Sequence, residues 1–182
     1  MPNHITNQLK AIGDKKDIEN LFESVKSENR DIDFEKIIPM PEHIYRGNLS
    51  KEEEEKYGKE NCWYEWSLSN WGTKWNAYDI CKVDENTIQF DTAWSGVPNI
   101  MVELSKLHPN VELHYKYADE DTGNNVGSHI IKNSNDYERD IINNSKEAYE
   151  IYIELKGESN CLYFDKEIDN YIHKDCDECE GC

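Results

Sequence analysis

The stretch WYEWSLSNWGTKWNAYD, residues 63–79, holds four of the chain's five tryptophans, and the fifth, Trp94, follows one predicted strand later. A tryptophan side chain is bulky, and its indole N–H needs a hydrogen-bond acceptor when it is buried. Asn70, Gly72 and Thr73 can supply turn geometry and hydrogen bonds within this block. We therefore predict that the block locks a strand against the core. The alternative is a recognition surface, because exposed tryptophans dominate the energetics of protein interfaces.

Hydrophobic periodicity on both sides of this block predicts six regular elements. They are a strand at 4–12, a helix at 14–29, two strands at 75–83 and 87–94 that form a hairpin, a helix at 99–108, and a strand at 111–118. In the first strand, Asn7 interrupts the apolar face. The order strand, helix, strand, strand, helix, strand predicts an α+β fold, the ferredoxin-like βαββαβ sandwich, with both helices on one face of an antiparallel sheet.

The remaining parts of the chain are predicted to be additions to this sandwich. We assign residues 1–120 to the ferredoxin-like core, with an acidic insertion at 40–62, residues 121–174 to a C-terminal elaboration packed on the core, and residues 175–182 to an irregular, acidic, cysteine-rich tail. Within the elaboration, the runs at 149–155 and 161–164 are predicted to be additional strands.

The charge of the chain restricts its partners. Thirty-eight acidic residues against 20 basic ones give a net charge of −18. Nucleic-acid binding rests on Lys and Arg side chains that neutralise phosphates, so direct DNA or RNA binding is disfavoured and a basic partner is expected. No apolar run reaches the length of a membrane span, the first residues lack a secretion signal, and the six cysteines show no evident disulfide framework. We therefore expect a cytoplasmic protein without a membrane partner.

The sheet face opposite the helices is predicted to be polar and acidic. Strand parity places the following side chains there: Trp75, Asp79, Gln89, Asp91, Glu112, His114 and Lys116. A histidine beside a carboxylate could serve general acid–base chemistry or bind a metal, and the alternative is an ordinary solvated face. No phosphate-binding loop, nucleophile elbow or paired-histidine helix accompanies these residues. We therefore predict no enzymatic activity and assign no catalytic residue.

Four potential metal ligands recur near the C-terminus at three-residue intervals. They are His173, Cys176, Cys179 and Cys182. This spacing is compatible with a tetrahedral zinc site, and the alternative is a frayed tail with free thiols. No other cofactor is expected.

Four short motifs resemble those of one protein family. They are MPN at 1–3, IIPMP at 37–41, NWGTKWNA at 70–77 and TAW at 92–94. They resemble the YubB ferredoxin-like domain proteins, which phages, plasmids and related elements carry. The resemblance covers roughly residues 1–120, and it implies a ferredoxin-like fold and a mobile-element origin but no established activity. This chain departs from the family pattern at His4-Ile5 and at Ser95-Gly96.

These observations lead to one functional hypothesis and one alternative. The hypothesis is a non-enzymatic acidic protein of a phage or mobile element, located in the host cytoplasm. It would inhibit a nucleic-acid-binding host defence protein by occupying its basic surface, as an anti-CRISPR protein or a DNA mimic does. The expected contact residues are Glu52, Glu53, Glu54, Glu55, Trp63, Trp66, Trp71, Asp119, Glu120, Asp121, Asp165, Glu167 and Asp169. The alternative is a small-ligand-binding or metal-dependent protein, a ligand sequesterer or an enzyme, with a pocket near the tryptophan block.

Overall fold

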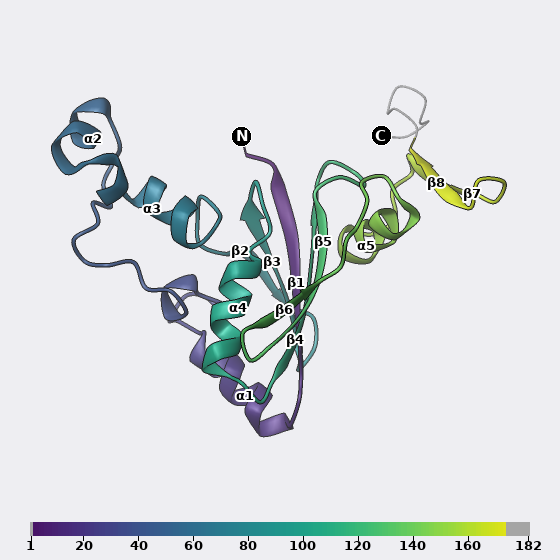
Figure 1. Ribbon diagram of the computed structural model, residues 1–182, viewed down its shortest axis with the longest axis horizontal. Coiled ribbons are helices and arrows are strands. Elements are labelled where there is room, and N and C mark those ends of the chain that lie inside the picture. Colours follow the sequence, from purple (N-terminus) through teal and green to yellow (C-terminus); the bar gives the residue numbers. More distant parts are fainter. Residues whose placement is uncertain (1, 174–182) are drawn as a thin grey trace.

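A six-stranded antiparallel sheet forms the centre of the molecule (Figure 1). The computed structural model describes residues 2–173. The strands are β1 (His4–Ile12), β2 (Tyr78–Lys82), β3 (Thr87–Ala93), β4 (Glu112–Asp119), β5 (Val126–Lys132) and β6 (Asn135–Glu138), in the spatial order β2-β3-β1-β4-β5-β6. The first four strands and two helices form the predicted βαββαβ sandwich, and β5 and β6 extend it beyond β4.

One face of the sheet is covered by α1 (Lys15–Ser24) and α4 (Pro98–Leu107) (Figure 1). The Asp14 carboxylate caps α1 by accepting a hydrogen bond from the Lys16 amide, and Pro98 lies in the first turn of α4. Alternate residues of β1 point into the core, where Leu9 pairs with Ile88 of β3 and Tyr115 of β4. The predicted polarity of the opposite face is confirmed for two strands. In β4, Leu113 and Tyr115 are buried while Glu112, His114 and Lys116 are half-exposed, and in β3 the half-exposed residues are Gln89 and Asp91.

Asn7, which interrupts the apolar face of β1, is completely buried and fully hydrogen-bonded. Its Nδ2 donates to Thr92 Oγ1 at 2.9 Å, and its Oδ1 accepts from the Tyr115 hydroxyl at 2.6 Å. That hydroxyl accepts in turn from the Val97 amide at 2.6 Å. The interruption in the sequence is therefore the centre of a buried polar network that ties β1 to β3, β4 and the start of α4.

On the opposite face lies α5 (Lys146–Lys156), and it replaces the strand predicted at 149–155. The prediction was wrong because the apolar residues of 149–155 fit both the two-residue period of a strand and the 3.6-residue period of a helix. Ser145 caps the helix, and Ala148, Ile151 and Leu155 recur at helical spacing. These side chains pack on Ala118 and Val126 in a second, smaller core. The strand predicted at 161–164 is confirmed as β7 (Leu162–Asp165), which pairs with β8 (Asn170–His173) in a separate two-stranded sheet.

The segment between α1 and β2 contains four short helices. They are η1 (Phe34–Lys36), α2 (Lys51–Tyr57), η2 (Lys59–Asn61) and α3 (Trp63–Asn70). In Figure 1, α2 and α3 extend away from the sheet to one side, while α5 and the β7–β8 hairpin lie at the other side. Among the residues described, no helix has the length and apolar character needed to cross a membrane.

Candidate functional site

Two tryptophans of the block belong to the core. Trp66 lies in α3 and Trp71 directly after it, and their exposed fractions are 9% and 4%. The Trp71 indole N–H donates to the Ile38 carbonyl at 2.9 Å, and its ring packs perpendicular to that of Trp66. The prediction that Trp66 and Trp71 contact a partner is therefore wrong, because both side chains are buried and the Trp71 N–H already has its acceptor.

The last tryptophan of the block and the separate Trp94 lie on the surface. Trp75 is 38% exposed and Trp94 is 40% exposed. Between them lies Lys74, whose ammonium nitrogen is 4.4 Å from the centre of the Trp75 ring, 5.4 Å from Trp94 and 5.9 Å from Tyr64. These distances are within the range of cation–π attraction. We call Tyr64, Lys74, Trp75, Tyr78 and Trp94 the aromatic surface.

Tyr78 and Trp63 lie at two sides of the aromatic surface. The Tyr78 ring packs edge-on against Trp75 at 6.3 Å, and its hydroxyl hydrogen-bonds His4 Nδ1 at 2.8 Å. Burial, followed by the nearby carboxylates of Asp91, Asp79 and Glu120, raises the pKa of Tyr78 to about 12. On the other side, Trp63 is half-buried, donates its N–H to the Gly47 carbonyl and packs against Tyr64. Of the three predicted tryptophan contacts, only Trp63 borders this surface.

The backbone of Trp94 has an unusual conformation. Its φ angle is +72°, in the left-handed region that a bulky side chain rarely occupies. Hydrogen bonds hold it there, since the Trp94 amide donates to the Asn3 carbonyl at 3.0 Å and Asn125 Nδ2 donates to the Trp94 carbonyl at 3.1 Å. Such a conformation costs roughly 1 kcal/mol for a non-glycine residue. The surrounding loops therefore hold an exposed tryptophan in a strained position.

Asp119 has a structural role in the loop that holds Trp94. It is 4% exposed, and its carboxylate accepts hydrogen bonds from the Asn3 and Asn125 side chains and from the Asp121 amide. The predicted partner contact at Asp119 is wrong for this reason. Glu120 and Asp121, by contrast, are exposed in the same loop, and the Glu120 amide donates to the His4 carbonyl. Glu120 brings negative charge close to Tyr78 of the aromatic surface.

The other predicted acidic contacts lie in two distant places. Glu52, Glu53, Glu54 and Glu55 belong to α2, whereas Asp165, Glu167 and Asp169 belong to the β7–β8 hairpin at the opposite end of the molecule (Figure 1). Several of these groups have local partners, such as Lys59 for Glu54 and Lys146 for Asp169. The acidic residues therefore form three separate groups and not one patch.

The predicted histidine–carboxylate pair forms on the open face of the sheet. His114 Nε2 lies 2.8 Å from Glu112 Oε1, and this contact lowers the pKa of Glu112. Both side chains are partly exposed and come from the same strand. The pair has the geometry of a surface ion pair.

The predicted zinc ligands cannot be placed as a set. His173 is the exposed last residue of β8, and Cys176, Cys179 and Cys182 lie outside the described residues. Within residues 2–173, no group of three or more His, Cys, Asp or Glu side chains could hold a metal ion.

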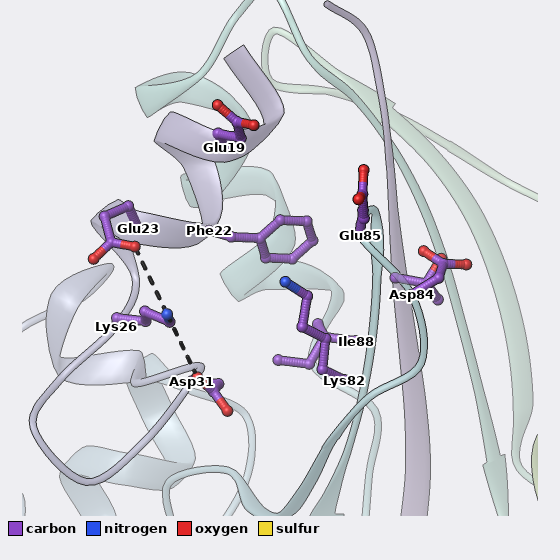
Figure 2. A pocket seen from close by; sticks show the side chains of 10 residues that line it. Glu19, Phe22, Glu23, Lys26, Asp31, Lys82, Asp84, Glu85 and Ile88 are labelled. Atoms are coloured by element: carbon purple, nitrogen blue, oxygen red, sulfur yellow. Dashed lines mark ion pairs between the residues drawn. The ribbon is translucent and has the colours of Figure 1, made fainter. Parts of the chain in front are cut away.

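Among the hollows on the β2 side of the sheet, two contain apolar or aromatic rings. One, of about 380 Å³, is an open depression beside the tryptophan block and is lined by Arg30, Trp75, Asn76 and Tyr78. The other, of about 150 Å³, lies between α1 and the β2–β3 hairpin, with Phe22 and Ile88 among its lining residues (Figure 2). Small-molecule sites usually measure about 300–1,000 Å³ and enclose most of their ligand. The first is therefore large enough but open, and the second is too small.

Comparisons with known proteins agree with the fold. A family model described as the ferredoxin-like domain in Api92-like protein matches residues 70–164. Searches of curated proteins and of solved structures found no match. The resemblance to a ferredoxin-like family is confirmed, although the matching family does not carry the YubB name and the match begins and ends later in the chain than predicted. The match starts within the tryptophan block and covers more than half of the chain. The chain therefore belongs to the family of ferredoxin-like domains in Api92-like proteins.

Proposed function

We propose that this chain is a non-enzymatic binding protein that docks its aromatic surface onto a basic protein partner. The observation that carries the proposal is the pair of exposed tryptophans, Trp75 and Trp94, arranged around Lys74. Tryptophan and tyrosine are enriched among the few residues that supply most of the binding energy of protein interfaces. The strained backbone of Trp94 supports a functional reason for its position, since such strain clusters at binding and catalytic sites.

The charge around the aromatic surface favours a basic partner. Asp79 and Glu120 are exposed and lie near Tyr78 of this surface, and the chain as a whole carries a net charge of −18. A negative potential attracts positively charged surfaces and accelerates their association. We expect the affinity to fall as the salt concentration rises, because screening weakens these interactions.

The partner class we propose is a nucleic-acid-binding protein of host defence. The surfaces that such proteins use to bind phosphates are rich in Lys and Arg. The resemblance to proteins of phages and plasmids supports a mobile-element origin for this chain, and an inhibitor of host defence fits that origin. In this mechanism the aromatic surface anchors the complex, and the acidic groups of the surrounding loops meet the basic residues that otherwise bind nucleic acid.

The test is a pull-down from host lysate at low and high salt, with a Trp75→Ala/Trp94→Ala double variant. The matched control is Tyr137→Ala/Ile142→Ala, which removes two exposed apolar side chains far along the chain, with exposed fractions of 65% and 72%. We expect the wild type and the control to capture a nucleic-acid-binding protein at low salt. We expect the double variant to lose at least about tenfold in capture, the loss typical of a truncated interface anchor.

The captured protein is then tested for nucleic-acid binding in the presence of the wild-type chain. We expect the chain to displace the nucleic acid. Equal capture by the double variant would refute the role of the aromatic surface, and capture without displacement would refute the mechanism of competition.

A second candidate function is small-ligand binding in the hollow of about 380 Å³ beside Trp75. Trp75 and Tyr78 offer apolar rings there, and Arg30 offers a positive charge that could orient an anionic ligand. This candidate predicts that a small molecule changes the tryptophan fluorescence and that Arg30→Ala abolishes the change. It also predicts that the protein captures no macromolecule at either salt concentration.

A further inference from the structure

The smaller hollow, between α1 and the β2–β3 hairpin, combines an apolar floor with a charged rim (Figure 2). Phe22 of α1 and Ile88 of β3 form the apolar part. Its volume is about 150 Å³ with the Lys82 side chain in place. In Figure 2 the Lys82 side chain points toward the Phe22 ring, and Glu19 and Glu85 flank the opening. The space suits one amphipathic side chain better than a complete small molecule.

The charges at the rim are unequal. The carboxylates are those of Glu19, Glu23, Asp31, Asp84 and Glu85, and the ammonium groups are those of Lys15, Lys26 and Lys82, so five minus three leaves a net charge of −2. Lys26 lies between Glu23 and Asp31 at 3.7 and 3.8 Å, and Lys15 lies 3.9 Å from Glu19 and 3.8 Å from Glu85. Within the described part of the chain, Lys82 has no carboxylate within 4.0 Å. Lys15 and Lys26 each serve two carboxylates, so the negative charge of the rim is only partly neutralised.

We propose that this hollow takes up one arginine side chain from a basic protein partner. The aliphatic stem of an arginine would cover Phe22 and Ile88, as the stems of long cationic side chains cover apolar surface elsewhere. Its planar guanidinium has five N–H donors and can serve two carboxylates at once, here Glu19 and Glu85 at the opening, which share the single ammonium group of Lys15. A lysine side chain has the same apolar stem, but its ammonium group is a compact point charge and lacks the planar set of donors. We therefore expect arginine to bind better than lysine.

In this proposal, Lys82 competes with the incoming arginine for the hollow. Its side chain has the same amphipathic character as the incoming residue and already points toward the apolar floor. Its ammonium charge opposes a second cation in the same space. The hollow lies near the opposite end of β2 from Tyr78 of the aromatic surface, so the two sites can be tested separately.

The test is an NMR titration of the full chain with a capped Gly-Arg-Gly peptide. The control peptides contain citrulline, which has the shape of arginine without the charge, or glutamate in the central position. We expect amide shifts confined to α1 and the β2–β3 hairpin, with a dissociation constant in the millimolar range typical of a single side chain. We expect no saturable shifts with either control peptide.

Two sets of variants test the charges. Glu19→Gln/Glu85→Gln is expected to weaken binding about tenfold, because it removes the carboxylates at the opening. The matched control, Glu158→Gln/Glu167→Gln, makes the same change of net charge at exposed positions outside the hollow and should leave binding unchanged. Lys82→Met keeps most of the apolar stem without the charge, and it is expected to strengthen binding about threefold.

Several outcomes would overturn the proposal. Equal binding of the glutamate peptide, shifts spread over α2 and the β7–β8 hairpin, or weaker binding by Lys82→Met would each do so. The Trp75→Ala/Trp94→Ala variant should bind the arginine peptide like the wild type. The arginine site and the proposed docking of the aromatic surface can therefore fail independently.

Discussion

Trp71 and Trp75 are four residues apart in one sequence block, yet Trp71 is 4% exposed and Trp75 is 38% exposed. The difference begins at Gly72, whose φ angle of +77° ends α3 and redirects the chain. Before the turn, the indole N–H of Trp71 has a backbone acceptor in the interior. After it, the ring of Trp75 lies beneath the Lys74 ammonium. Two tryptophans of one block thus differ in role because a single turn separates a helix from a surface loop.

The largest expected effect is the loss of stability in Trp71→Ala. We expect the free energy of unfolding to fall by about 4 kcal/mol, because the substitution removes a buried aromatic side chain and leaves a cavity beside Phe34 and Trp66. Urea denaturation followed by circular dichroism measures this change. Trp75→Ala is the matched control and should shift the free energy of unfolding by less than about 1 kcal/mol. Similar losses of unfolding free energy in both variants would contradict the assignment of Trp71 to the core and Trp75 to the surface.

The same contrast holds for two tyrosines, with a smaller expected effect. The hydroxyl of Tyr115 is completely buried between Asn7 and Val97, and burial raises its pKa well above the ordinary value. Tyr115→Phe leaves the Asn7 carbonyl oxygen and the Val97 amide without this partner, and we expect a loss of about 2 kcal/mol in the same denaturation experiment. Tyr78→Phe removes a partly exposed hydroxyl and should cost less than half as much. A larger loss in Tyr78→Phe would reverse the assignment of core and surface.

The sequence predicts the central sandwich well because its strands and two main helices have clear periods. The strand at 4–12, the β2–β3 hairpin and the helix ending near Leu107 are all present. The helix α5 was predicted as a strand, since Tyr149, Ile151 and Ile153 alternate while Ala148, Ile151 and Leu155 also repeat at helical spacing. Only the position of Ala118 and Val126 on the opposite face of the sheet decides between these periods.

The site was harder to predict than the fold, because exposure depends on tertiary contacts. The residues that flank Trp66 and Trp75 in the sequence do not indicate whether either ring is buried. The acidity of Asp119 suggested a surface contact, whereas it is buried at the end of β4 and accepts three hydrogen bonds that hold the neighbouring loops. One signal was available: TAW is followed by Ser95-Gly96, a turn pattern next to Trp94. Lys74 lies between two tryptophans in the sequence, which also places a cation near aromatic rings.

The smallest expected effect concerns the backbone at Trp94. Alanine and glycine remove the same indole ring, so the difference in stability between Trp94→Ala and Trp94→Gly reports on the φ angle of +72°. We expect the glycine variant to be more stable by about 1 kcal/mol, because glycine adopts this conformation without steric cost. At position 75, which is not among the residues with positive φ, alanine should instead be the more stable by roughly 0.5–1 kcal/mol.

The expected result is that glycine is more stable than alanine at position 94 and less stable at position 75. It would show that the backbone of Trp94, unlike that of Trp75, adopts a conformation that lowers stability. Selection for stability alone favours glycine or asparagine at such a position, since both tolerate positive φ. The proposed docking of the aromatic surface gives a reason for a tryptophan at this position that stability does not give. If alanine proved more stable than glycine at position 94 as well, the φ angle of +72° would not lower the stability of the protein. The case for the aromatic surface would then rest on its exposure and on the rings around Lys74 alone.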